Sequence, residues 1–132
     1  MRKILFKARR KSDNKWIYGY LIELGKESFS DEPRFGIRNK AIPIMGNSVS
    51  YNLYIDEVFP ETICQYTGLN DIYGRKIFEH DIINRFTTTE YKEEVKFNEG
   101  EFIICEIGDD NGPPLYTYLK STKILGNVFD IK

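Results

Sequence analysis

The sequence predicts a mainly β protein with little helix, built as a small barrel or as paired sheets. Three observations support this class. Short runs of aromatic and β-branched residues alternate with polar residues at period two. Turn-forming Gly, Asn, Asp and Pro separate these runs. No window of ten or more residues shows a convincing 3.6-residue period. A closed barrel is attractive because an open sheet of this size would leave exposed edges.

The N-terminal part is predicted to begin with a β-hairpin. A basic first strand over 2–10 is followed by the turn signal KSDN at 11–14 and by KWIYGYLI over 15–22. In this second strand the even positions from Trp16 to Ile22 share one face. Gly19, on the other face, indicates a bulge or the close approach of another backbone.

Residues 25–52 lose this periodicity, because Gly, Ser, Pro and Asn recur throughout them. A stretch of this length without a pattern indicates either an irregular excursion or a partly mobile loop, in which only residues 41–45 resemble a short strand. Compact structure is expected again from 53 to 59. We therefore expect an N-terminal β region over 1–59 and a C-terminal β region over 60–132.

The C-terminal part is predicted to consist of short strands and tight corners. Residues 61–66 resemble a strand that ends at Thr67-Gly68, and Asp71 to Gly74 has the residue preference of a type I turn. Asn98-Glu99-Gly100 lies between two β-forming runs and predicts a second hairpin. Two further β-like pieces are expected over 115–121 and 123–131.

Composition excludes several classes. The 132 residues suit one domain or two very small ones. The two cysteines lack a metal-binding spacing and are expected to be free thiols. We expect no membrane span and no secretory signal, because charges interrupt every apolar run. Residues 1–59 contain eleven Lys/Arg and seven Asp/Glu, a net charge of +4. Residues 60–132 contain eight and thirteen, a net charge of −5.

Three blocks of the sequence resemble one known family. WIYGYLI follows a basic first strand, PETICQYTGLNDIYGRKIFEHDII spans 60–83, and ILGNVFD spans 124–130. They look like the YopX family of bacteriophage and prophage proteins, whose central pattern is roughly P-E-T-x-G-Q-Y-T-G-L-x-D-x-x-G-x-x-I-x-E-G-D-I-V. The resemblance implies a mainly β fold whose C-terminal part is an SH3-like barrel, and it brings no established activity. The positions that carry the motif are expected to be structural: Pro60, Gln65, Tyr66, Thr67, Gly68, Leu69, Asp71, Gly74, Ile77, Glu79, His80, Asp81, Ile82, Gly126 and Asn127.

The chain departs from this pattern at two glycine positions, where it has Cys64 and His80. If the family's glycine before Asp81 adopts a positive φ, its replacement must do the same. Histidine is one of the non-glycine residues enriched in the left-handed region. We therefore expect His80 to occupy a corner of the backbone.

Catalysis is not expected from this sequence. His80 is the single histidine and lies in a loop segment without a neighbouring nucleophile. Cys64 and Cys105 lie in apolar strands, where buried inert thiols are usual. The acids of the C-terminal half lack the spacing of a metal-binding loop, and we expect solvated strand faces instead: Glu90, Glu93, Glu94, Glu99, Glu101, Glu106, Asp109 and Asp110. No cofactor is implied.

Two binding hypotheses remain open. Basic residues interleaved with Phe6, Trp16 and Tyr18 are typical of a nucleic-acid surface, and the candidate contacts are Arg2, Lys7, Arg9, Arg10, Lys11 and Lys15. However, the aromatic residues alternate as core residues would, and lysines also protect edge strands. The opposite charges of the two halves favour either packing within one chain or head-to-tail self-association of subunits.

We expect a non-catalytic accessory protein of a phage or prophage that acts in the bacterial cytoplasm as a binding or assembly module. Its expected partner is a second copy of itself, forming a homo-oligomer, or another phage or host protein. The alternative function is nucleic-acid binding by the basic N-terminal face.

Overall fold

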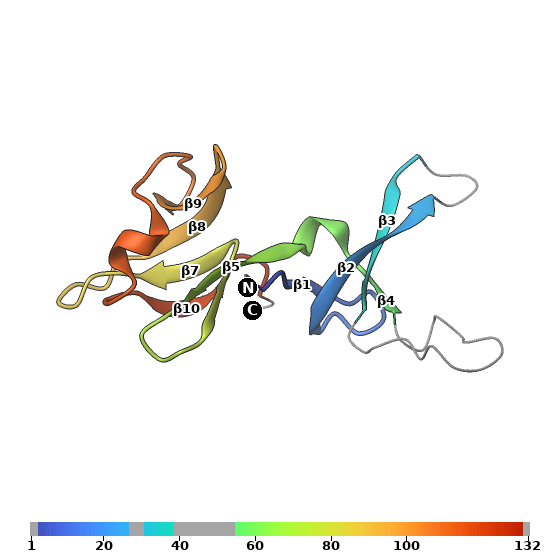
Figure 1. The fold of residues 1–132 in the computed structure, drawn as a ribbon, viewed down its shortest axis with the longest axis horizontal. Coiled ribbons are helices and arrows are strands. Elements are labelled where there is room, and N and C mark those ends of the chain that lie inside the picture. Colours follow the sequence, from blue (N-terminus) through green and yellow to red (C-terminus); the bar gives the residue numbers. More distant parts are fainter. Residues whose placement is uncertain (1–2, 27–30, 39–54, 131–132) are drawn as a thin grey trace. The chain divides into compact units, whose positions relative to one another are not determined.

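The computed structural model describes residues 3–26, 31–38 and 55–130, and their structure is mainly β. The chain divides into an N-terminal unit, Ile4–Gln65, and a C-terminal unit that begins at Tyr66 (Figure 1). Helical structure in the described ranges is limited to two short 3-10 turns, η2 (Pro60–Thr62) and η3 (Leu115–Tyr118). The predicted fold class is confirmed. The expected domain boundary before Pro60 stays a prediction.

The N-terminal unit is an antiparallel sheet in the order β4-β3-β2-β1, continued by the first two residues of β5. Its core consists of Ala8, Ile17, Ile37 and Val58, which are all buried. The strands are β1 (Phe6–Arg9), β2 (Trp16–Lys26), β3 (Pro33–Arg38), β4 (Ile55–Val58) and β5 (Cys64–Asn70).

The predicted N-terminal hairpin is present, because β1 and β2 pair antiparallel from Phe6↔Gly19 to Arg9↔Trp16. Gly19 is needed for close packing, as the sequence indicated. A Cβ atom at this position would lie 2.2 Å from the carbonyl oxygen of Arg38. A side chain here would therefore separate the backbones of β2 and β3.

The prediction of an irregular loop over 25–52 is wrong for residues 33–38, which form β3. This strand pairs with β2 on one side and with β4 on the other. Its sequence, PRFGIR, is short and begins with proline, so the local pattern is weak. The strand depends on partners on both sides and on Ile37 in the core. The parts of the predicted loop at 27–30 and 39–52 lie outside the described residues.

The C-terminal unit contains a four-stranded antiparallel sheet in the order β10-β7-β8-β9 (Figure 1). Its core is formed by Ile77, Ile83, Val95, Ile104 and Leu115, all fully buried. The strands are β7 (Asp81–Asn84), β8 (Glu93–Asn98), β9 (Glu101–Glu106) and β10 (Lys123–Asn127), and β6 (Lys76–Phe78) pairs with the later part of β5. No strand ladder in the described residues joins β6 to the four-stranded sheet, so closure into an SH3-like barrel stays a prediction.

The tight corners lie where the sequence places them. The N–H of Gly74 donates to the carbonyl oxygen of Asp71 at 3.0 Å, which closes the predicted turn. His80 has φ 69°, in the left-handed region expected of it. Glu99 and Gly100 both have positive φ, 51° and 85°, so a two-residue loop connects β8 to β9. Two successive left-handed residues are characteristic of the type I′ turn.

Three local predictions are wrong. The strand expected over 61–66 begins only at Cys64, because Pro60 starts the 3-10 turn η2. Gly68 does not end this strand but lies inside it with φ 85°. The β-like piece expected over 115–121 is η3 instead. Leu115 of this turn and Leu119, which follows it, both pack in the core, and their spacing of four suits a helical turn.

Candidate functional site

Three neighbouring strands of the N-terminal unit place aromatic and basic side chains on one face. In the β1–β2 ladder Lys7 lies opposite Tyr18, and Arg9 lies opposite Trp16. In the β2–β3 ladder Tyr20 lies opposite Arg38. Directly opposed residues point to the same side of a sheet. We call this set the aromatic–basic face: Lys7, Arg9, Trp16, Tyr18, Tyr20 and Arg38.

The period of β2 explains why these residues share a face. Ile17 points to the opposite side, where it packs with Ala8 and Ile37 in the core. Tyr18 and Tyr20 therefore point away from the core and remain 50% and 57% exposed. The alternation of these aromatic residues in the sequence is typical of core residues. That interpretation is wrong for both tyrosines.

The cations of the face lie against its rings. The Nζ atom of Lys7 is 4.4 Å from the centroid of Trp16, and Cζ of Arg9 is 5.3 Å from the same ring. Cζ of Arg38 is 5.1 Å from the Tyr20 centroid. Such cation–π contacts hold a ring and a cation together. The Nε–H group of Arg38 is buried and has no acceptor among the described residues.

The structure separates the basic residues that the sequence grouped together. Lys7 and Arg9 belong to the aromatic–basic face, where both are buried. Lys15 is exposed. Arg2 lies outside the described residues.

Arg10 and Lys11 belong to a separate cluster of ion pairs. Arg10 pairs with Asp13 at 2.7 Å and with Asp56 at 3.2 Å, and Lys11 pairs with Glu57 at 2.7 Å. Hydrogen bonds from Arg34 and Lys11 lower the pKa of Glu57 to about 2. This cluster is internally compensated, so it offers less positive charge to a ligand than its sequence indicates.

Sequence reasoning missed two members of the face as binding residues. Tyr20 was detectable from its period, because it follows Trp16 and Tyr18 at steps of two. Arg38 was not detectable, since β3 was not predicted.

The motif residues of the C-terminal unit hold corners and strands together. The Asp71 carboxylate accepts hydrogen bonds from the backbone N–H groups of Tyr73, Arg75 and Ile124 and from the Arg75 side chain. Burial alone would raise the pKa of Asp71, but these hydrogen bonds outweigh it and the pKa lies below its ordinary value. Asp71 thereby joins its own turn to β10.

A second set of motif residues fixes the backbone near β7. Asp81 accepts from the N–H of Phe78 at 2.8 Å and from the side chain of Asn127 at 2.9 Å. Thr67 donates to the carbonyl oxygen of Ile77 at 2.8 Å. The other predicted motif positions lie in strands, turns or the core: Pro60, Gln65, Tyr66, Gly68, Leu69, Gly74, Glu79, His80, Ile82 and Gly126.

The candidate reactive groups lie in separate surroundings. Nδ1 of His80 is 2.8 Å from Oε2 of Glu94, and its ring packs edge-on against Phe129. Cys64 and Cys105 are buried free thiols. Burial raises the pKa of the Cys105 thiol, which disfavours the reactive thiolate. The described part of the chain contains no group of three or more His, Cys, Asp or Glu arranged to hold a metal ion.

These features define an all-β protein with two small antiparallel units and an aromatic–basic face whose two tyrosines are exposed. Residues 5–131 match the model of the YopX protein family, and the chain belongs to this family. No curated protein matches the chain. No helix in the described ranges is long and apolar enough to cross a membrane.

A solved structure shows the same fold. The chain is similar to protein EF1440 from Enterococcus faecalis, known from a crystal structure, with a TM-score of 0.56 and 19% sequence identity. The match covers 98% of this chain and 95% of that one. At this level of identity the likeness concerns the fold alone.

Proposed function

We propose that this protein is a non-catalytic binding module that takes single-stranded nucleic acid on the aromatic–basic face. The observation that carries the proposal is the pair of exposed side chains Tyr18 and Tyr20, which follow Trp16 on one face of β2 with three cations beside them. Exposed aromatic rings next to positive charge are the usual platform for stacking unpaired bases.

The spacing of the two tyrosines suits an unstacked strand. Residues two apart in a β-strand are separated by about 7 Å, whereas stacked bases rise by about 3.4 Å each. Each ring can therefore receive its own base once the strand is extended. The half-buried guanidinium of Arg38, beside Tyr20, adds a positive charge near the second ring. Lys7 and Arg9 add positive potential while they hold Trp16 in place.

The proposal is tested by fluorescence anisotropy with a labelled oligo-dT of roughly two dozen nucleotides. Lys7 and Arg9 are only 8% exposed, so Arg38 is the cation of this face that a phosphate can contact, and the logarithm of affinity should fall with a slope of about −0.7 against the logarithm of salt concentration. Replacing Tyr18 and Tyr20 together by alanine should weaken binding by tenfold or more, since stacking contributes about 1–3 kcal/mol per base. Arg38→Ala should make this slope shallower by about 0.7, the value for one phosphate contact on a single strand.

Two matched controls separate this face from general effects. Tyr116 is 65% exposed on η3, so Tyr116→Ala removes a similar exposed ring elsewhere. Lys11→Ala removes a cation that is already paired with Glu57. Both variants should bind like the wild type. Equal losses of oligonucleotide affinity in the control and test variants would contradict the proposal. A lack of binding at about 50 mM salt would also contradict it, because phosphate contacts are strongest at low salt.

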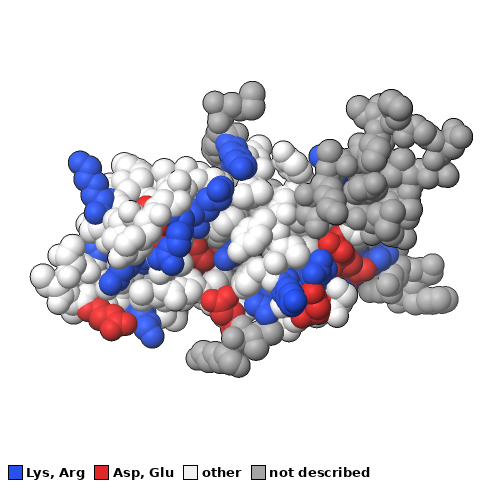
Figure 2. Space-filling model, turned by 90° about the horizontal axis from the view of Figure 1, so that it is seen from below, with Lys and Arg blue, Asp and Glu red and all other residues white. Residues whose placement is uncertain are grey.

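A second candidate function is self-association as an assembly module, which the opposite net charges of residues 1–59 and 60–132 favour. On the face drawn in Figure 2, basic and acidic side chains are interspersed, so such a contact would rely on local pairs. Light scattering at micromolar concentration tests this candidate. A monomer at every concentration would exclude it.

The setting we propose is the bacterial cytoplasm, with the protein encoded by a bacteriophage or prophage. This proposal is supported by membership of the YopX family. Neighbouring genes for phage structural or replication proteins would support it, and a stable chromosomal operon of metabolic genes would contradict it.

A further inference from the structure

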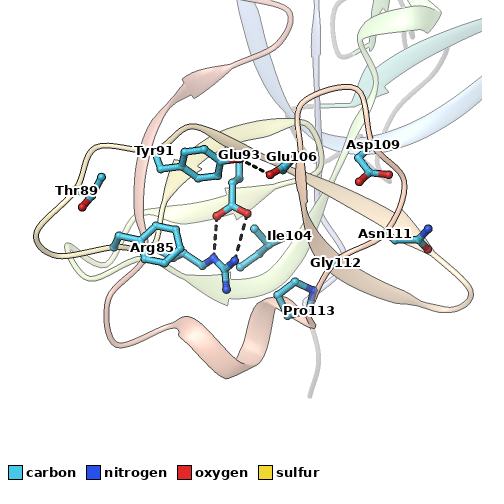
Figure 3. Close-up of a pocket in the computed structure, with 11 residues that line it drawn as sticks. Arg85, Thr89, Tyr91, Glu93, Ile104, Glu106, Asp109, Asn111, Gly112 and Pro113 are labelled. Carbon is cyan, nitrogen blue, oxygen red and sulfur yellow. Dashed lines mark hydrogen bonds and ion pairs between the residues drawn. The ribbon is translucent and has the colours of Figure 1, made fainter.

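The C-terminal unit contains a pocket that the proposed function does not use. Its volume is about 670 Å³, within the usual range for ligand sites. It is formed by the segment between β7 and β8, the start of β8, the end of β9 and the loop that follows β9 (Figure 3). The lining residues include one cation, three carboxylates and two aromatic rings: Arg85, Glu93, Glu106, Asp109, Phe86 and Tyr91.

The cation of this pocket is already paired. Nε of Arg85 donates to Oε1 of Glu93 at 2.8 Å, and a second guanidinium nitrogen lies 3.4 Å from Oε2 (Figure 3). The guanidinium also lies 4.7 Å from the centroid of Phe86 and 4.4 Å from that of Tyr118. The Arg85–Glu93 pair is therefore electrically neutral and fixed by rings.

A second carboxylate stands directly opposite this pair. Glu106 on β9 is the ladder partner of Glu93 on β8. Like charges directly opposite each other destabilise a sheet. Arg85 compensates Glu93, whereas the partner shown for Glu106 is the neutral hydroxyl of Tyr91, which donates to it at 2.5 Å. The pKa of Tyr91 is raised by this hydrogen bond.

Asp109 adds a third carboxylate from the loop after β9. One of its oxygens accepts from the backbone N–H of Asp110 at 2.8 Å. The nearby cation Lys96 contacts the Asp109 carbonyl oxygen and the Asp110 carboxylate, and it does not line the pocket. With Arg85 and Glu93 cancelling, the lining keeps a net charge of −2 from Glu106 and Asp109.

Aromatic rings stand beside this negative charge. Phe86 and Tyr91 are 40% and 39% exposed, and their centroids are 6.0 Å apart in an edge-to-face arrangement. A ring beside a carboxylate is the environment in which a guanidinium is stabilised, because it can stack on one and pair with the other. Arg85 already shows this combination within the same pocket.

We propose that this pocket binds an arginine side chain carried by an extended segment of a protein partner, with its guanidinium beside the Phe86–Tyr91 rings and paired with the Glu106 carboxylate. The pocket is larger than one side chain, which leaves room for the residues that flank the arginine. Binding would also relieve the opposition of Glu93 and Glu106. This site lies in the C-terminal unit and is independent of the aromatic–basic face.

The experiment is a two-dimensional amide NMR titration of the full chain with the blocked pentapeptide Ala-Ala-Arg-Ala-Ala. The amide signals of Tyr91, Glu106 and Asn111 should shift saturably. The same peptide with citrulline, a neutral isostere of arginine, should cause no saturable shift. The lysine peptide should bind more weakly, because an ammonium group cannot form the planar stacked pair.

Two variants locate the site, and a third variant is the matched control. Glu106→Gln removes the charge with little change of shape, and Phe86→Ala removes an exposed ring. Each should weaken peptide binding by about fivefold or more. Glu101 is exposed at the other end of β9, so Glu101→Gln should leave the affinity for the arginine peptide unchanged. The Tyr18/Tyr20 double variant should also keep peptide binding, which separates this site from nucleic-acid binding.

Several results would overturn the proposal. Equal binding of the arginine and citrulline peptides would show that charge is not recognised. If the lysine peptide or free spermidine shifts the same amides and binds as tightly as the arginine peptide or more tightly, the pocket recognises an ammonium group and the proposal of an arginine ligand is wrong. A lack of saturable shifts up to roughly 10 mM peptide, equivalent to a free energy of binding weaker than about −3 kcal/mol, would exclude the site.

Discussion

The side-chain amide of Asn127 donates a hydrogen bond of 2.9 Å to Oδ1 of Asp81, although the two residues are 46 positions apart. Asp81 is 2% exposed, and its other oxygen accepts from the N–H of Phe78. The carbonyl oxygen of the Asn127 amide accepts from the N–H of Phe129 at 2.9 Å. The Glu-His-Asp and Gly-Asn segments of the family motif thus form one buried network between β7 and β10.

Asn127→Ala should destabilise the protein by about 2–4 kcal/mol, because it removes a hydrogen bond to a buried charged group. The free energy of unfolding in urea measures this loss. Asn111→Ala, in the loop after β9, is the control and should cost less than about 0.5 kcal/mol, as is usual for an exposed position. Similar stability of the two variants would mean that the Asp81–Asn127 hydrogen bond contributes little.

His80 provides a test of backbone strain. His80→Gly and His80→Ala both remove the contact with Glu94, but only alanine retains the cost of a positive φ. The alanine variant should therefore be less stable than the glycine variant by about 1–2 kcal/mol. Thermal unfolding of the two variants measures the difference. Equal melting temperatures would show that the corner relaxes when the histidine is removed.

Asp71 should contribute to acid unfolding. Its pKa in the folded protein lies below the ordinary value of 3.8. The ionised Asp71 carboxylate therefore contributes its full stabilisation above the pKa that Asp71 has in the unfolded chain. This contribution is lost as pH falls through the lower pKa of Asp71 in the folded protein. Urea unfolding should show wild type more stable than Asp71→Asn at pH 7, with the gap narrowing below about pH 4. A gap that is constant from pH 7 to pH 2 would contradict this assignment.

Gly112 should be intolerant of any side chain. A Cβ atom at this position would lie 1.6 Å from the carbonyl oxygen of Ile104, so the loop after β9 would have to move away from the strand. Gly112→Ala should lose the hydrogen bond from Ile104 to Pro113 and destabilise the protein by about 1–3 kcal/mol. It should also weaken binding of the arginine peptide, since Gly112 and Pro113 line the pocket.

Gly126→Ala is the comparison for Gly112→Ala. Its Cβ would first meet a side-chain oxygen of Asp130 at 3.2 Å, and that side chain can adjust. The loss of stability should therefore be smaller than for Gly112→Ala in the same urea measurement. The reverse order would mean that the loop after β9 accommodates the methyl group.

The candidate binding face was predictable in part. The period of β2 places Trp16, Tyr18 and Tyr20 on one side of a strand. It does not say whether that side faces the core or the solvent. Arg38 joins this face through the β2–β3 ladder, and β3 has too weak a local pattern to be recognised. The sequence also grouped Arg10 and Lys11 with the binding residues, but distant acids at Asp56 and Glu57 compensate them.

The pocket was less predictable than the face. The sequence predicts solvated strand faces for Glu93, Glu94 and Glu106, which is wrong for Glu93 and Glu94 because both are buried. The direct opposition of Glu93 and Glu106 depends on the register of the β8–β9 hairpin, and the pairing of Arg85 depends on the path of the chain from β7 to β8. These relationships involve residues from several segments, so no single segment reveals them.

The sequence by itself determined the mainly β class, the two hairpins and the turn at Asp71–Gly74, and its resemblance to the YopX family indicated the left-handed corner at His80. These features depend on the φ preferences and hydrogen bonds of a few adjacent residues. The tertiary structure decided that Tyr18 and Tyr20 face solvent, that β3 forms, and that Asn127 meets Asp81. Each of these outcomes depends on which distant segments pack or pair together, because burial and hydrogen-bond partners are properties of the assembled sheets.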